Sequence, residues 1–68
     1  MEKYLVFYDT KNCITTITKC RVIDINKWGY FEVAYLDKCG ITHRDNIFDN
    51  LEQARKYVGQ ANKIEIGV

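Results

Sequence analysis

Runs of β-prone residues follow one another through most of the chain, and only a few turn-forming residues separate each run from the next. The runs cover Tyr4 to Tyr8, Ile14 to Ile25, Tyr30 to Leu36 and Ile41 to Ile47. The intervening segments, 9–12, 26–29 and 37–40, are rich in Asp, Asn and Gly, which favour tight turns. A parallel crossover needs a dozen or more residues, so connections this short join antiparallel neighbours. The pattern predicts an antiparallel sheet of consecutive hairpins.

The runs differ in how much of each strand we expect to be buried. Tyr4 to Tyr8 is apolar on both faces, which is typical of a central strand. Tyr30 to Leu36 alternates, so that one face should contact the core. That face carries Phe31, Val33 and Tyr35. Ile41 to Ile47 is the most polar run and is predicted to lie at a sheet edge.

The run from Ile14 to Ile25 contains a change of parity. Cys20 and Val22 share one face, whereas Ile23 and Ile25 share the other. A one-residue shift moves every following side chain to the opposite face of a strand. We therefore expect a β-bulge or a crossing of the sheet edge between Val22 and Ile23.

A helix signal follows Ile47. Asp49 and Glu52 have the spacing of a capping box, in which the first side chain accepts an amide hydrogen bond and the glutamate reaches back. An apolar stripe then recurs at steps of three and four residues. Its members are Leu51, Ala54, Val58 and Ala61. Gly59 is suited to end the helix in a left-handed conformation.

The last residues alternate again, with Ile64, Ile66 and Val68 on one face, and predict a short final strand. The expected order is ββββαβ, which is an α+β domain with one C-terminal helix. A small open sheet and an SH3-like barrel both fit this order. With no linker or repeat in the chain, we expect a single compact domain over residues 1–68.

The segment from Ile47 to Val58, with the sequence IFDNLEQARKYV, resembles a strand-to-helix junction common in small phage-encoded accessory proteins and SH3-like modules. This resemblance implies an architecture and identifies no functional residue. The chain is rich in Lys, Ile, Asn and Tyr and has no proline. Such a bias is typical of AT-rich genomes, including those of low-GC bacteria and their phages.

Charge and cysteine content limit the function classes. The formal net charge is +1, so the total charge predicts no strong attraction to nucleic acid. No apolar stretch approaches the roughly 20 residues of a membrane span, and no secretory signal is evident. The odd number of cysteines, 3, favours reduced thiols over a disulfide framework. We expect a cytoplasmic protein with no membrane partner.

The residues that could carry metal or catalytic chemistry are few. Zinc would require Cys13, Cys20, Cys39 and His43, but only the last two have the close spacing of a zinc knuckle. A cysteine nucleophile would need His43 beside it, and nothing in the sequence places them together. The chain has no serine and no glycine-rich phosphate loop. We predict no metal, no cofactor and no enzymatic activity.

Exposed aromatic residues beside cations are common anchors in protein interfaces. Trp28 and Tyr30 flank the second predicted turn, with Lys27 beside them. We therefore predict a protein-binding module, of the kind by which a phage or mobile element modulates or inhibits a host protein. Trp28 and Tyr30 would be the anchors, with Lys27 and Arg44 as polar contacts at the rim. In the alternative interpretation, Trp28 covers the open end of the core.

A second hypothesis is a nucleic-acid-binding small barrel. Lys19 and Arg21 share a strand face, and His43 and Arg44 lie on the polar fourth run, so these residues could form a basic patch. A solvated sheet face is the alternative explanation. Under either function, the unpaired edge of the fourth strand could pair with another copy of the chain.

Overall fold

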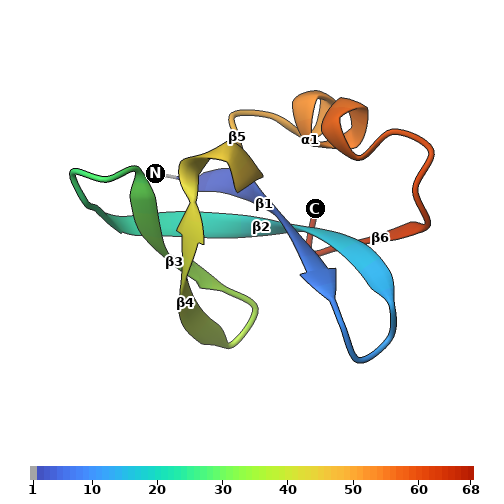
Figure 1. Ribbon diagram of the computed structural model, residues 1–68, viewed down its shortest axis with the longest axis horizontal. Helices are drawn as coiled ribbons and strands as arrows, with labels where there is room; N and C mark the ends of the chain where they lie inside the picture. Colours follow the sequence, from blue (N-terminus) through green and yellow to red (C-terminus); the bar gives the residue numbers. More distant parts are fainter. Residues whose placement is uncertain (1) are drawn as a thin grey trace.

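The computed structural model describes residues 2–68 as a mainly antiparallel β-sheet with one short α-helix, an α+β fold (Figure 1). In chain order the elements are β1 (Glu2–Asp9), β2 (Ile14–Ile25), β3 (Tyr30–Tyr35), β4 (Lys38–His43), the 3-10 helix η1 (Arg44–Asn46), β5 (Ile47–Phe48), α1 (Leu51–Val58) and β6 (Lys63–Ile66). Within these residues, no helix has both the length and the apolar character that crossing a bilayer requires.

The sheet is organised around the long strand β2. The strand order is β4-β3-β2-β1-β5, and β6 also pairs with β2. One edge of β2 pairs with β1. The opposite edge pairs with β6, in parallel, along 15–18 and then with β3 along 20–25. Strand β2 therefore extends across the molecule and joins both ends of the sheet (Figure 1).

The parity shift predicted in β2 is confirmed. Val22 pairs with Val33 and Asp24 pairs with Glu32, so Ile23 is the extra residue of a β-bulge. The predicted core face of β3 is also confirmed. Val33 is 0% exposed, and Phe31 and Tyr35 pack against the same cluster.

The fourth strand differs from the predicted run Ile41 to Ile47, because β4 covers Lys38–His43. The expected turn at 37–40 is wrong, because Lys38 already pairs with Tyr35 and only Leu36 and Asp37 form the loop. Gly40 lies within β4 opposite Val33 rather than in a turn, and the Tyr35 ring lies 3.5 Å from where its Cβ would be, an ordinary contact distance. The strand ends at His43, η1 interrupts it, and 47–48 becomes the separate strand β5, which pairs with β1.

The helix begins one residue later than predicted. Asn50 is the N-cap, and its side-chain oxygen accepts a hydrogen bond from the Gln53 amide at 2.9 Å. Asp49 forms an ion pair with Lys3 of β1 instead. Gly59 ends the helix, as predicted, but its φ of 67° and ψ of -132° lie outside the left-handed helical conformation that was expected. The helix ends at Val58, so Ala61 is not part of its apolar stripe.

The core consists of two clusters that share the β1–β2 pair. Leu5, Cys20 and Val33 form one cluster. Val6, Ile17 and Ala54 form the other, which includes the buried residue of α1. Successive residues of a strand point to opposite faces, so the neighbours Leu5 and Val6 enter different clusters. This arrangement explains why the first run is apolar on both faces.

Candidate functional site

The turn between β2 and β3 is held by the side chain of Asn26. Its Oδ1 accepts hydrogen bonds from the amides of Trp28 at 2.9 Å and Tyr30 at 3.0 Å. The Asn26 amide donates to the Tyr30 carbonyl at 2.9 Å, and Gly29 has a φ of 86° that suits glycine. These bonds satisfy backbone groups that a tight turn often leaves to solvent, so the turn presents its side chains from a defined backbone.

Trp28 projects from this turn and is 70% exposed. It belongs to neither core cluster, so the alternative in which it covers the core is not what the structure shows. The Lys27 Nζ atom lies 4.8 Å from the centroid of its ring. This is cation–π distance, and it keeps a positive charge beside the exposed indole.

Strand β4 and η1 bring further side chains to the turn. Tyr30 pairs with His43, and their rings meet edge to face with centroids 5.3 Å apart. The Arg44 amide donates to the Gly29 carbonyl at 2.9 Å. The Arg44 side chain lies 3.6 Å from where a Cβ on Gly29 would be. The arginine chain therefore lies within contact distance of the turn, while the positive φ is what favours glycine at this position.

His43 is oriented by η1. Its Nδ1 atom accepts a hydrogen bond from the Asp45 amide at 3.2 Å and lies 3.3 Å from the Asp45 carboxylate. The imidazole thus caps the 3-10 helix on one side and contacts Tyr30 on the other. We call the group formed by Lys27, Trp28, Tyr30, His43 and Arg44 the hairpin-end surface.

The residues predicted as partner contacts therefore lie together. They are Trp28, Tyr30, Lys27 and Arg44.

The basic residues of the second hypothesis do not form one patch, because Lys19 and Arg21 lie apart from His43 and Arg44. Arg21 pairs with Ala34, four residues along β3 from Tyr30. At the usual rise of a strand, that spacing is roughly 13 Å. Lys19 and Arg21 instead line a different hollow with Glu2.

The candidate zinc ligands do not converge. Cys13 lies in the β1–β2 turn and Cys39 on β4, both exposed, while Cys20 is buried in the core. Burial raises the pKa of the Cys20 thiol. Among residues 2–68, no three side chains of the metal-binding types gather in one place.

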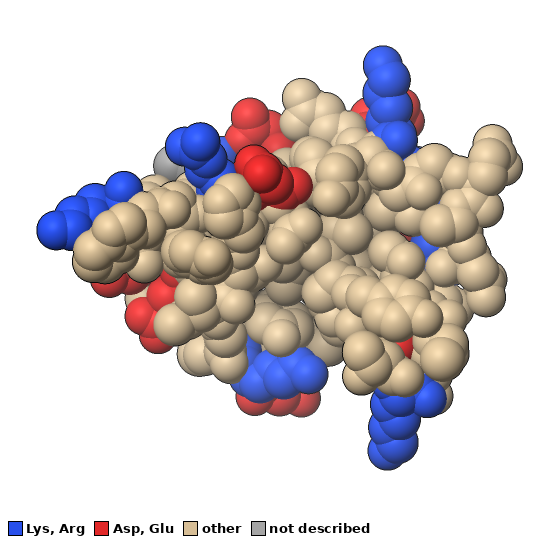
Figure 2. Space-filling model, viewed as in Figure 1, with Lys and Arg blue, Asp and Glu red and all other residues tan. Residues whose placement is uncertain are grey.

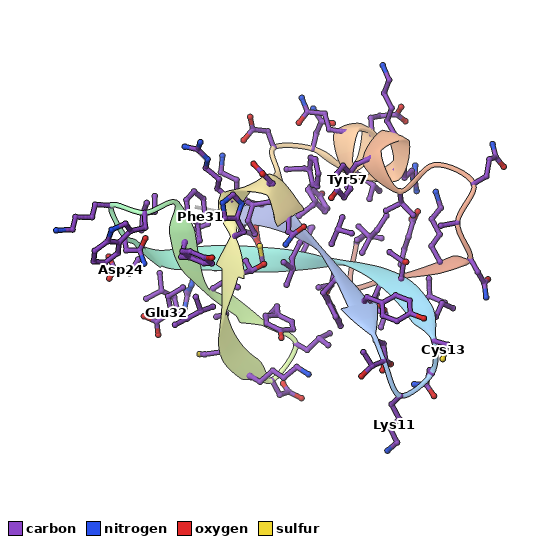
Figure 3. All side chains as sticks on the ribbon, in the orientation of Figure 1. Lys11, Cys13, Asp24, Phe31, Glu32 and Tyr57 are labelled. Atoms are coloured by element: carbon purple, nitrogen blue, oxygen red, sulfur yellow. The ribbon has the colours of Figure 1, made fainter. Side chains whose placement is uncertain are left out.

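An apolar hollow near the hairpin-end surface was not predicted. It is lined by Lys3, Val22, Ile23, Asp24, Ile25 and Phe31. Figure 3 shows Asp24, Phe31 and Glu32 at the β2–β3 end of the sheet, far from Lys11 and Cys13 in the other hairpin turn. Ile23 and Ile25 are 50% and 60% exposed. The parity shift in β2 was the sequence signal for this hollow, because the bulge alters which side chains face the core.

Charges of both signs surround these features. On the face drawn in Figure 2, lysine and arginine side chains are separated by acidic and uncharged residues rather than joined in a stripe. Asp24, Glu32 and Asp45 are exposed acidic residues on the elements that carry the hairpin-end surface. A continuous phosphate-binding track is not visible on this face.

The chain matches no protein-family model, no curated protein and no solved structure.

Proposed function

We propose that this chain is a small non-catalytic protein-binding module that contacts its partner through the hairpin-end surface. The observation that carries the proposal is the 70% exposure of Trp28 on a hydrogen-bonded turn. Trp, Tyr and Arg are the residue types enriched at the energetic centres of protein interfaces. The Asn26 hydrogen bonds support the proposal further, because a preorganised anchor loses little conformational entropy on binding.

The surroundings of Trp28 support a protein partner. The apolar hollow at the same end of the sheet offers a place for a partner's apolar side chain, with Lys3 and Asp24 beside it. Mixed charges around an aromatic centre are typical of a protein interface, where they contribute to specificity. The AT-rich composition bias supports a phage or mobile-element origin. On that basis we propose the role of a modulator or inhibitor of a cytoplasmic host protein.

We also propose that the six-stranded sheet of this chain is an incomplete SH3-like barrel. Two features support it: a one-turn 3-10 helix joins β4 to β5, and β5 pairs with β1. The two ends of the hairpin series are thereby brought toward each other. The pairing of β5 covers only Tyr4 and Leu5, and the rest of that edge of β1 has no strand partner among residues 2–68.

A second candidate function is binding of single-stranded nucleic acid. The observation in its favour is that Lys27, His43 and Arg44 lie around two exposed aromatic rings. Bases stack on such rings while cations contact phosphates. The net charge of +1 and the neighbouring carboxylates make this function the less favoured one.

The test is an affinity pull-down of the tagged chain from bacterial lysate, with and without nuclease, followed by measurement of Kd for the captured partner. Trp28→Ala should weaken binding about 30-fold or more, the loss expected for a central interface anchor. Tyr8→Ala is the matched control, because Tyr8 is also an exposed aromatic, at 57%, but lies on β1. Its Kd should stay within about threefold of the unmodified chain.

The outcomes separate the two functions. A protein that survives nuclease and is lost with Trp28→Ala supports the protein-binding proposal. Partners that vanish with nuclease, with salt-dependent binding to oligonucleotides, would transfer the assignment to nucleic acid. Equal Kd values for the Trp28 and Tyr8 variants, with circular dichroism unchanged, would refute the hairpin-end surface as the binding site.

A further inference from the structure

Strand β4 has an unpaired edge. In the sheet of residues 2–68 it is the terminal strand beyond β3, so only one of its two edges has a strand neighbour. An unpaired edge presents backbone donors and acceptors that can pair with another strand. The register of the β3–β4 hairpin shows which residues carry those groups.

Hydrogen-bonded and non-hydrogen-bonded pairs alternate along an antiparallel ladder. The Arg44 amide bonds to the Gly29 carbonyl, which continues the register in which Tyr30 pairs with His43. Thr42 and Gly40 therefore also direct their backbone groups toward β3. The alternate residues direct theirs away from the sheet, and these are Cys39, Ile41 and His43.

The centre of this edge lacks the features that normally prevent strand pairing, and the charged Lys38 lies at the end of the strand. Natural edge strands are protected by charged residues, prolines or bulges. The centre of β4, Cys39–Thr42, has no charged residue and no proline, and the β3–β4 pairing contains no register shift. Ile41 is 75% exposed, the highest value among the exposed large hydrophobic residues. The most exposed apolar side chain thus lies at the middle of the open edge.

We propose that β4 pairs antiparallel with β4 of a second copy of this chain, with Ile41 opposite Ile41. The outward backbone groups are spaced evenly about Ile41, at Cys39 and His43 on either side. A two-fold axis at Ile41 therefore matches the outward groups of one strand with those of the other, and Cys39 comes opposite His43. Each of these pairs exchanges two backbone hydrogen bonds.

One further observation favours a second copy as the occupant. The net charge of +1 creates little repulsion between identical molecules. Because the contact is confined to one short strand, we expect a weak dimer, with Kd in the micromolar range or above.

The first test is disulfide trapping in a chain that carries Cys13→Ser and Cys39→Ser, so that only buried Cys20 remains. In the proposed register, Ile41 and its copy form a hydrogen-bonded pair with Cα atoms about 5.5 Å apart, which is suitable for a disulfide. Ile41→Cys should therefore give a covalent dimer with oxidised glutathione at least about tenfold faster than Ile25→Cys. Ile25 is the matched control, because it is 60% exposed and lies two strands away.

The second test follows the unmodified chain by sedimentation equilibrium up to about 1 mM, a range that covers weak interfaces. The average mass should rise toward that of a dimer. Ile41→Lys should return it to the monomer mass, whereas Ile25→Lys should leave the association unchanged. Trp28→Ala should also leave it unchanged, which separates this proposal from the hairpin-end surface.

The proposal would be overturned by equal trapping rates for the two cysteine variants, or by a monomer mass at every concentration. Loss of association with Trp28→Ala but not with Ile41→Lys would also overturn it. The trapping experiment remains decisive if the lysine variant fails to fold, because isoleucine to cysteine keeps an uncharged side chain at an exposed position.

Discussion

At the scale of single residues, the backbone of Leu36 is the clearest local conflict. Leu36 has a φ of 52° in the two-residue loop between β3 and β4. In this left-handed region the Cβ of an L-residue crowds the following carbonyl, at a cost of roughly 1–2 kcal/mol. Asn tolerates this region better than Leu does. The short loop imposes the conformation, because Tyr35 and Lys38 on either side are already paired.

We predict that Leu36→Asn raises the free energy of unfolding by about 0.5–1 kcal/mol, because it relieves part of this strain. Urea denaturation measures the change. Leu36→Ala is the control, since it removes the same side chain without favouring positive φ, and it should give no gain. If the Asn and Ala variants are equally stable, backbone strain at this position is refuted.

At the scale of elements, an ion pair joins α1 to β6. A helix of 8 residues is too short to be stable alone in water. It is attached to the sheet through buried Ala54 and through a bidentate ion pair. Arg55 donates from Nε and Nη2 to the two Glu65 oxygens, each at 2.7 Å. Glu65 lies on β6, so this pair connects the helix to the only parallel strand pairing among residues 2–68.

The Arg55–Glu65 pair predicts a pH dependence of stability. The hydrogen bonds from Arg55 lower the pKa of Glu65 in the folded chain. A carboxylate with a lowered folded pKa stabilises the protein above its unfolded pKa, about 4.3, and loses that contribution as the pH falls through the folded value. Glu65→Gln should therefore flatten the fall of unfolding free energy below about pH 4.3.

The measurement is a series of urea titrations from about pH 7 to about pH 3, the window in which carboxylates titrate. Glu32→Gln is the control, because Glu32 is exposed and makes no ion pair among those found in residues 2–68. Its pH profile should keep the shape of the unmodified chain. An unchanged profile for Glu65→Gln would show that the ion pair does not contribute to stability in solution.

At the scale of the whole molecule, the buried hydrophobic side chains are divided between two small clusters on opposite faces of the β1–β2 pair. A chain of this length is expected to have a free energy of unfolding of about 3–10 kcal/mol. Each cluster is small, so a single cavity removes a large share of that stability. Ile17, 0% exposed, occupies the centre of the cluster that includes α1.

We predict that Ile17→Ala lowers the unfolding free energy by about 2–5 kcal/mol, the cost of a buried cavity. Ile23→Ala should cost less than about 1 kcal/mol, since this bulge residue is 50% exposed. Urea denaturation followed by circular dichroism compares the two. Similar losses in both variants would contradict the assignment of Ile17 to a tightly packed core.

The sequence predicted local features well where neighbouring residues cause them. The bulge at Ile23 was predictable because an alternating strand reveals its own change of parity. The N-cap was predicted one residue early, because Asp49 and Asn50 are both good caps and nothing local distinguishes them. Lys3, 46 residues away, takes the Asp49 carboxylate. Gly40 was interpreted as a turn residue, but the β3–β4 loop closes earlier, at Leu36 and Asp37, and Gly40 pairs with Val33.

The same contrast between local and long-range causes applies to the candidate site. The turn around Trp28 was predictable from Asn26 and Gly29, whose side-chain oxygen and positive φ suit a tight turn. The contribution of Arg44 depends on the β3–β4 register, which brings it beside Gly29. The exposure of Trp28 was left open by the sequence, since an aromatic residue at a turn can either project into solvent or fold over the sheet.

The sequence by itself determined that consecutive short-looped strands pair as antiparallel hairpins and which side chains of β3 face the core. Both depend on loop length and on the two-residue period of a strand, which are local properties. Only the tertiary structure decided that β5 pairs with β1, that β6 joins β2 in parallel, and that the outer edge of β4 has no strand partner among residues 2–68. The backbone donors and acceptors of any strand edge are alike, so the choice among edges depends on packing between residues far apart in the chain.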